Sequence, residues 1–168
     1  MISYGYLSGE FITGMDEGRP LLARTPEARF TLANLMRSNL DTSLGAIRLG
    51  MDILKDEGVA IDRLLGHGGL FKTKGVGQQI MADALDTPVW VMKTAGEGGP
   101  WGMALLAAYL VREDKALSLP EFLDKVIFRN AESSRLDPKA EGVEGFNRFM
   151  QRYTACLPVE KAATQYLK

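Results

Sequence analysis

Cysteine and histidine are scarce in this sequence of 168 residues, which holds one of each, Cys156 and His67. A single cysteine excludes an intramolecular disulfide, and the pair cannot supply the four ligands of a thiolate-based zinc site. With one histidine, a Ser-His-Asp or Cys-His catalytic set is a weak hypothesis. As a general base, His67 would need a partner such as Asp83 or Glu97, and we expect it to shape a glycine turn instead.

Charge imbalance and long hydrophobic runs are missing as well. Lysine and arginine number 20 and aspartate and glutamate 21, for a formal net charge of −1. This balance argues against a nucleic-acid-binding protein and against a polybasic membrane-surface module. The longest stretch without charge, residues 98–111, is too short to span a bilayer, and the N-terminus lacks the pattern of a signal peptide. We therefore predict a cytoplasmic protein with no membrane and no nucleic-acid partner.

Helix and strand patterns alternate along the first 112 residues. In chain order they predict a helix over 31–57, a strand over 61–65, a helix over 75–86, a strand over 89–92 and a helix over 101–112. The first helix has an apolar stripe at steps of three and four residues, which Gly58 ends. The last is apolar on all sides, which predicts a buried helix. This order predicts an α/β fold with two parallel neighbouring strands.

The two ends of the chain differ from this alternation. The elements predicted there are short strands at 4–7 and 20–24, a helix beginning at a Ser118–Glu121 capping box, a helix beginning at Asp137 and a short helix over 159–167. We expect one domain over residues 1–112 and a helical extension over residues 113–168 packed on it.

Two glycine clusters, Gly66–Gly69 and Gly96–Gly99, stand where a strand pattern gives way to a helix pattern. Such turns bring backbone N–H groups close to a ligand, but a tight turn that needs positive φ looks the same in a sequence. Spacing therefore leaves a phosphate or nucleotide site and a structural turn open, and neither cluster is a Walker A or Rossmann motif. Glu97 is expected to cap the following helix; contact with a ribose or a metal-bound water is the alternative.

In their order and spacing these motifs resemble the C-terminal part of the FGGY carbohydrate kinases. The matching segments are Leu65-Gly-His-Gly-Gly69, Gln79-Ile-Met-Ala-Asp83-Ala-Leu-Asp-Thr-Pro-Val89, Glu97, Gly102-Met-Ala-Leu-Leu-Ala-Ala108 and the helix that begins at Phe30. The resemblance covers residues 28–112 well and the tail loosely. It implies an actin-like (RNase H-like) ATPase domain with a helical C-terminal appendage. It also implies a sugar kinase that transfers the γ-phosphoryl group of ATP, with Mg²⁺, to a hydroxyl of a sugar, commonly a pentulose such as xylulose or ribulose.

Carried over onto this sequence, the resemblance implies a set of residues that bind the nucleotide. They are the adenosine-motif glycines Gly68 and Gly69, the base-bordering residues Leu70, Phe71 and Thr73, and the acidic Glu97. Two departures bear on them. The linker from Leu70 to Gly77 is slightly longer than in typical relatives, which leaves the base-contacting residue open, and His67 stands where the family often has glycine.

Several parts of the family's active site have no match in this sequence. The chain contains no Gly-Thr-Gly phosphate turn, and Asp16 and Asp41 lie in no context that matches the catalytic aspartate. The chain therefore resembles roughly the last third of such a kinase. The implied partners are an N-terminal sugar-binding domain and the sugar substrate. We expect no catalytic residue and no metal ligand within these residues, and an isolated chain that is inactive; whether Met1 is the native start stays open.

Two alternatives remain beside the kinase interpretation. The first is a non-catalytic nucleotide-sensing or protein-interaction module that keeps the actin-like half-fold, for which a stable homodimer would be a supporting observation. The second is an unrelated α/β fold in which the glycine turns arose by chance.

Overall fold

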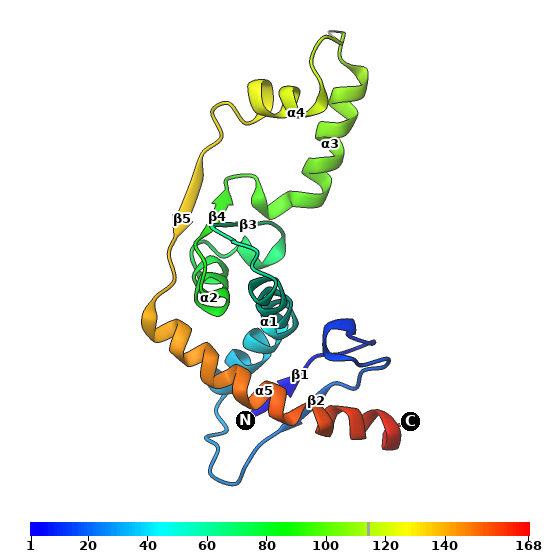
Figure 1. Ribbon diagram of the computed structural model, residues 1–168, viewed down its shortest axis with the longest axis vertical. Coiled ribbons are helices and arrows are strands. Elements are labelled where there is room, and N and C mark those ends of the chain that lie inside the picture. Colours follow the sequence, from blue (N-terminus) through cyan, green and yellow to red (C-terminus); the bar gives the residue numbers. More distant parts are fainter. Residues whose placement is uncertain (114) are drawn as a thin grey trace. The chain divides into compact units, whose positions relative to one another are not determined.

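The computed structural model describes residues 1–113 and 115–168 and divides into two compact units (Figure 1). Unit 1 comprises Met1–Ile61, Asp83–Asp86 and Pro138–Lys168, and unit 2 comprises Asp62–Ala82 and Thr87–Asp137. The predicted division at residue 112 does not coincide with these units, because the chain returns to unit 1 after Asp137.

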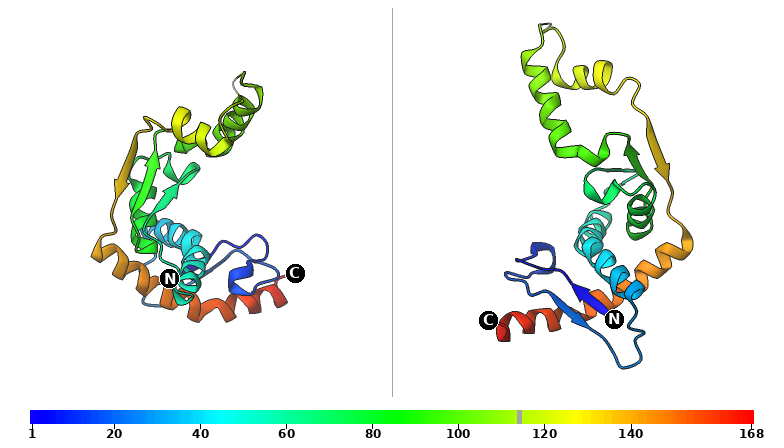
Figure 2. Two further views of the ribbon diagram at one scale, coloured as in Figure 1. Left: turned by 45° about the horizontal axis from the view of Figure 1, so that its top comes forward. Right: turned by 180° about the vertical axis from the view of Figure 1, so that it is seen from behind.

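Unit 1 joins two short strands to the two longest helices. Its elements are β1 (Ile2–Tyr4), the 3₁₀ turn η1 (Phe11–Thr13), β2 (Leu21–Ala23), α1 (Leu32–Asp56) and α5 (Ala140–Tyr166). Strands β1 and β2 pair antiparallel with Tyr4 opposite Leu21. Strand β2 lies within the strand predicted over 20–24, whereas β1 precedes the strand predicted over 4–7 and shares only Tyr4 with it. Helices α1 and α5 pack on β1 and on each other, as the views in Figure 2 also show.

Tyrosines fill the centre of unit 1. Tyr153 on α5 is fully buried. The Tyr4 hydroxyl donates a hydrogen bond to the Tyr153 carbonyl oxygen, and the Tyr6 and Tyr153 hydroxyls hydrogen-bond to each other. Burial, above all, raises the pKa of Tyr4 and of Tyr153 well above the usual tyrosine range. Phe146 and Phe149, which also belong to α5, complete this core.

Helix α1 has nearly the predicted length, and Gly58 ends it with a φ of 74°. Its buried face, however, comprises Ser38, Asp41, Thr42, Leu44, Gly45 and Met51. Much of the predicted apolar stripe is therefore not buried, because Leu32, Met36 and Ile47 are exposed. Small and polar residues occupy the buried face instead, because they let neighbouring segments of the chain come close. The Ser38 and Ser3 hydroxyl oxygens, for example, lie 2.9 Å apart, in hydrogen-bond contact.

Unit 2 is built on a sheet in the strand order β3-β4-β5. Strands β3 (Leu64–Gly66) and β4 (Val89–Met92) are parallel, as predicted, and α2 (Val76–Leu85) lies between them in the sequence. Strand β3 begins three residues later than predicted, at Leu64. Buried Gln78 ties the sheet to α2, because its amide nitrogen donates to the carbonyl oxygens of Val89 (2.8 Å) and Ser134 (3.0 Å).

The extension after residue 112 is not purely helical, which corrects the expected helical appendage. Strand β5 (Ser133–Leu136) pairs antiparallel with β4 and forms a sheet edge. Its serines are exposed, so its sequence lacks the apolar alternation that identifies a strand. The helix predicted over 159–167 is also not separate, since α5 continues through Pro158.

Helix α3 (Gly98–Val111) begins three residues before the predicted start and is not buried as predicted. Within α3, all of which the structure describes, Leu105 is the one buried residue, whereas Met103, Leu106 and Leu110 are exposed. The reason is that its contact with α4 (Leu119–Phe122) lies near its C-terminal end, where the Tyr109 and Phe122 ring centroids are 5.5 Å apart. In the described part of the chain, no helix is both long and apolar enough to cross a membrane.

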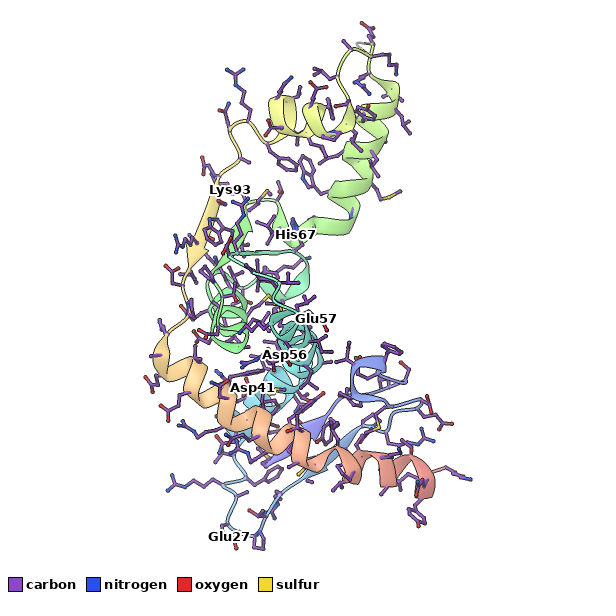
Figure 3. All side chains as sticks on the ribbon, viewed as in Figure 1. Glu27, Asp41, Asp56, Glu57, His67 and Lys93 are labelled. Atoms are coloured by element: carbon purple, nitrogen blue, oxygen red, sulfur yellow. The ribbon has the colours of Figure 1, made fainter. Side chains whose placement is uncertain are left out.

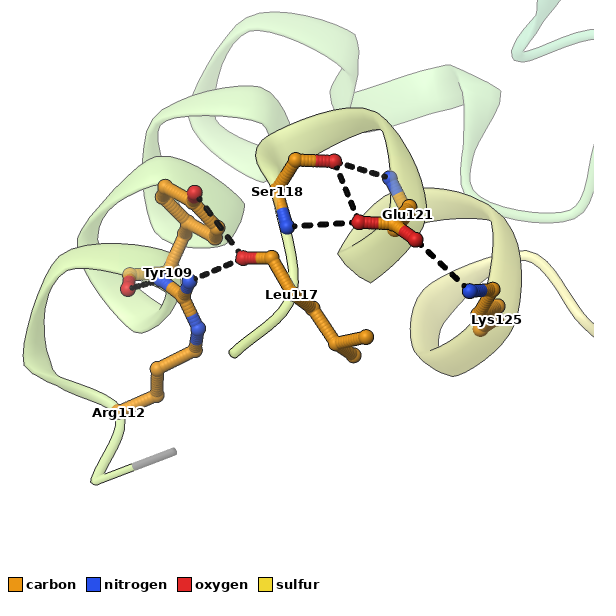
Figure 4. A network of polar contacts seen from close by, with 6 residues as sticks. All are labelled: Tyr109, Arg112, Leu117, Ser118, Glu121 and Lys125. Carbon is orange, nitrogen blue, oxygen red and sulfur yellow. Dashed lines mark hydrogen bonds and ion pairs between the residues drawn. The ribbon is translucent and has the colours of Figure 1, made fainter. Parts of the chain in front are cut away.

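The capping box at the start of α4 is confirmed (Figure 4). The Glu121 backbone N–H donates to the Ser118 hydroxyl oxygen at 3.4 Å, and the Ser118 backbone N–H donates to the Glu121 carboxylate at 3.0 Å. Beside it, the Arg112 guanidinium lies 3.5 Å from the centroid of the Tyr109 ring and donates to the Leu117 carbonyl oxygen at 2.5 Å. The π-helical segment η4 (Leu123–Ile127) continues from α4.

Glu121 provides a direct test of this cap. Hydrogen bonds from Lys125 and Ser118 lower the pKa of its carboxyl group from 4.5 to about 2. Because the pKa is depressed in the folded state, the stabilisation is complete above the unfolded value and is lost as the pH falls toward 2. Ser118→Ala should raise the Glu121 pKa, measured by NMR titration of the carboxyl carbon, and Ser43→Ala on α1 should leave it unchanged. An unshifted pKa in Ser118→Ala would contradict the cap.

Two glycines of α1 give opposite predictions for the stability of unit 1. A Cβ at Gly45 would lie 2.6 Å from Cζ of Tyr153, whereas a Cβ at Gly50 would meet no atom within 4 Å. Gly45→Ala should therefore lower the free energy of unfolding by about 1–3 kcal/mol through overpacking. Gly50→Ala should raise it by up to about 1 kcal/mol through helix propensity. Urea unfolding followed by circular dichroism measures both, and equal signs would contradict the packing of α1 on α5.

Candidate functional site

Parallel pairing brings the two glycine clusters together in unit 2. Gly66 at the end of β3 lies opposite Val91 of β4, so the turns that follow the two strands are neighbours. These turns are the 3₁₀ segments η2 (Gly69–Phe71) and η3 (Ala95–Glu97). The Gly68 backbone N–H donates to the Ala95 carbonyl oxygen at 2.7 Å and joins them directly. The two clusters thus form one local structure at the carboxyl edge of the sheet.

Two glycines of the first cluster are required, Gly68 by its backbone conformation and Gly66 by a neighbouring side chain. Gly68 has φ 98° and ψ −170°, a region that residues with a side chain hardly enter. A Cβ at Gly66 would lie 2.3 Å from Cζ of Phe71, so the Phe71 ring packs directly on the Gly66 backbone. Gly69 has neither constraint, because a Cβ there would meet no atom within 4 Å. Gly69 therefore faces open space beside the joined turns.

A pocket of about 510 Å³ lies beside these turns. Its lining residues are Phe71, Lys72, Val91, Met92, Lys93, Thr94, Ala95, Gly96, Glu97 and Trp101. Of the predicted site residues, Phe71 and Glu97 line it, and Gly68 supports it through Ala95. Leu70 and Thr73 do not line it. The Leu70 carbonyl packs against Gly77, and the Thr73 carbonyl oxygen accepts a hydrogen bond from Val76 N–H at 3.2 Å.

Glu97 does not cap α3 with its side chain, which corrects the expected capping role. It occupies the position before the helix, but its carboxylate makes no capping hydrogen bond. Instead Glu97 Oε1 lies 2.9 Å from Nζ of Lys72, and both side chains are exposed. An exposed pair of this kind contributes little to stability. Both side chains are consequently available at the rim of the pocket.

Among the lining residues that the sequence analysis did not predict, three have side chains that suit a ligand, namely Lys72, Lys93 and Trp101. The indole Nε1 of Trp101 is buried and has no hydrogen-bond partner among the described residues. A buried donor without an acceptor is unfavourable and marks a position for an acceptor. Lys93 lies at the end of β4 (Figure 3) and forms an ion pair with Glu132. In the sequence, these three residues could have been found only from their position, because each lies close to a glycine cluster.

His67 is exposed, and its expected role in shaping the glycine turn stays a prediction. A Cβ at Gly98 would lie 3.0 Å from Cβ of His67, so the histidine packs against the start of α3. Among the residues that the structure describes, no three histidine, cysteine or acidic side chains gather as they would around a metal ion.

Unit 2 has an α/β fold with two paired glycine turns at the carboxyl edge of its parallel strands. The model of the "FGGY family of carbohydrate kinases, C-terminal domain" matches residues 1–111. The chain therefore belongs to the FGGY family of carbohydrate kinases, as the sequence motifs had indicated.

Solved structures with a similar fold include two xylulose kinases. The enzyme from Rhodospirillum rubrum is 20% identical with a TM-score of 0.55, over 95% of this chain and 31% of its own. The ligand-bound enzyme from Lactobacillus acidophilus is 17% identical with a TM-score of 0.67, over 98% of this chain and 31% of its own. At this identity the likeness concerns the fold. The chain spans about a third of the length of these kinases, and no curated protein matches it.

The geometry of the first glycine turn predicts different effects at neighbouring positions. Gly68→Ala should destabilise unit 2 by about 1–3 kcal/mol, because a side chain is strained at its φ and ψ. Gly69→Ala should be nearly neutral, because its Cβ would meet no atom within 4 Å. Thermal unfolding of the two variants measures the difference. Equal melting temperatures would show that the turn does not have this conformation.

Proposed function

We propose that unit 2 binds the adenosine part of ATP and that the whole protein is a sugar kinase of the actin-like class. In this proposal the kinase transfers the γ-phosphoryl group of ATP to a hydroxyl of a pentulose such as xylulose. The observation that carries the proposal is the pocket beside the two joined glycine turns. The family and the similar fold of two xylulose kinases support it.

The residues around the pocket suit a nucleotide. A volume of about 510 Å³ lies in the usual range for small-molecule sites. Phe71, Met92 and Trp101 offer apolar surface for a base, and the unpartnered indole N–H of Trp101 offers a donor for one of its acceptors. Lys72 would supply positive charge for phosphate oxygens, as would Lys93. The open space at Gly69 lets a ribose approach the backbone.

The remaining parts of the reaction would come from outside the described residues. When bound, ATP supplies the phosphoryl group, and Mg²⁺ neutralises its phosphates. The proposed partner is an N-terminal sugar-binding domain, which would carry the sugar site and the general base. Closure of the two domains would exclude water from the cleft. The residues of this chain bind and orient the nucleotide, and none of them acts as the base. No observation favours the non-catalytic alternative or a homodimer.

Blocking the pocket without disturbing the fold tests the nucleotide proposal. A Cβ at Gly96 would lie 3.4 Å from Cγ of Lys72, which is ordinary contact, so Gly96→Leu should fold and fill the pocket. Calorimetric titration of the 168-residue chain with ATP and Mg²⁺ should show weak binding that Gly96→Leu reduces at least about tenfold, a change of about 1.4 kcal/mol. The matched control is Gly99→Leu, because Gly99 is exposed and does not line the pocket.

Two outcomes would contradict the proposal. Unchanged ATP binding in Gly96→Leu would place the nucleotide elsewhere, and equal losses in both variants would point to a general effect on α3. Turnover of xylulose by the 168-residue chain would contradict the dependence on an N-terminal domain.

A further inference from the structure

Three arginines from three segments of unit 1 surround a second pocket. The pocket has a volume of about 480 Å³ and is lined by the loop at residues 25–29, by the first turns of α1 and by α5. Arg29 comes from the loop, Arg37 from α1 and Arg152 from α5. These residues play no part in the nucleotide pocket, which belongs to unit 2.

A buried carboxylate lies beside these guanidinium groups. Asp41 on α1 is 7% exposed. Its Oδ1 lies 2.9 Å from Nε of Arg37, and its Oδ2 accepts a hydrogen bond from the same nitrogen at 3.1 Å. Burial raises the pKa of Asp41, whereas the positive charges of Arg37 and Arg152 oppose that shift. Asp41 therefore orients Arg37 and neutralises one of the positive charges.

The other two arginines form no ion pair with an acidic side chain among the described residues. A second carboxylate, that of Glu27 in the loop, also lines the pocket (Figure 3 labels Glu27 and Asp41). Arg29 is held in place through its backbone, because its carbonyl oxygen accepts hydrogen bonds from Asn34 Nδ2 at 2.8 Å and from Thr31 N at 3.2 Å. The three arginines outnumber the two carboxylates that line the pocket, Asp41 and Glu27, so the lining carries an excess of positive charge.

We propose that this pocket binds the phosphate group of a small phosphorylated metabolite. Guanidinium groups match phosphate oxygens with paired, charge-assisted hydrogen bonds. A phosphate monoester carries close to two negative charges at neutral pH, and a lining with more arginines than carboxylates favours such an anion. The volume of the pocket suits a small metabolite rather than the bare ion. The inference does not rest on the proposed kinase function.

Titration of the 168-residue chain with two probes tests the site. Inorganic phosphate and a pentose 5-phosphate should bind at low ionic strength, measured by calorimetry, and added NaCl should weaken both. Equal affinities would assign recognition to the phosphate group, and tighter binding of the pentose 5-phosphate would assign a part to the sugar. If neither probe binds, the proposal is overturned.

Substitutions locate the binding in the pocket. Arg29→Gln and Arg152→Gln should each lower the affinity about tenfold. Arg148→Gln is the matched control on the same helix, because Arg148 pairs with Glu144 and does not line the pocket; it should leave the affinity unchanged. Asp41→Asn removes the opposing charge and should tighten binding, a gain that a loss of folding cannot produce. Equal losses in Arg148→Gln and Arg152→Gln, or unchanged affinity in Arg29→Gln and Arg152→Gln, would refute the site.

Discussion

The parallel pairing of β3 with β4 is the constraint on which the candidate nucleotide site depends. It sets Gly66 opposite Val91 and so brings the turns after the two strands into hydrogen-bond contact, with Gly68 N–H donating to the Ala95 carbonyl oxygen. Buried Gln78 holds α2 on the same sheet. The pocket is lined by residues from both turns, which are far apart in the sequence. It therefore depends on the strand pairing that brings the two turns together.

In unit 1 the corresponding constraint is close approach between helices. Gly45 admits the Tyr153 ring, and Ser38 meets Ser3 across the interface with β1. This contact fixes α5 on α1, so that Arg152 lies near Asp41 and shares a pocket with Arg37 and Arg29. The candidate nucleotide pocket in one unit and the arginine-lined pocket in the other thus arise from separate packing arrangements of the same chain.

The sequence predicted what depends on local pattern. Helices α1 and α2, strand β4 and the Ser118–Glu121 cap follow from periodicity and capping residues. The sequence-based predictions failed where contacts with other elements determine the structure. Exposed Ser133 and Ser134 form a strand because β4 offers them an edge, and the apolar α3 stays exposed because little of unit 2 covers it. Phe71 and Glu97 line the pocket, and their binding of the nucleotide stays a prediction, whereas Trp101 required the fold to bring it there.

The two tryptophans offer the most direct measurement of the central claim, that the joined glycine turns bind the nucleotide. Trp101 lines the pocket, whereas Trp90 does not. The Arg135 guanidinium lies over the Trp90 ring, 4.8 Å from the centroid of that ring. Titration of the chain with ADP and Mg²⁺, followed through the two indole N–H signals by NMR, should shift the Trp101 signal and leave that of Trp90 in place. A shift at Trp90 without one at Trp101, or no shift at a saturating nucleotide concentration, would contradict the account.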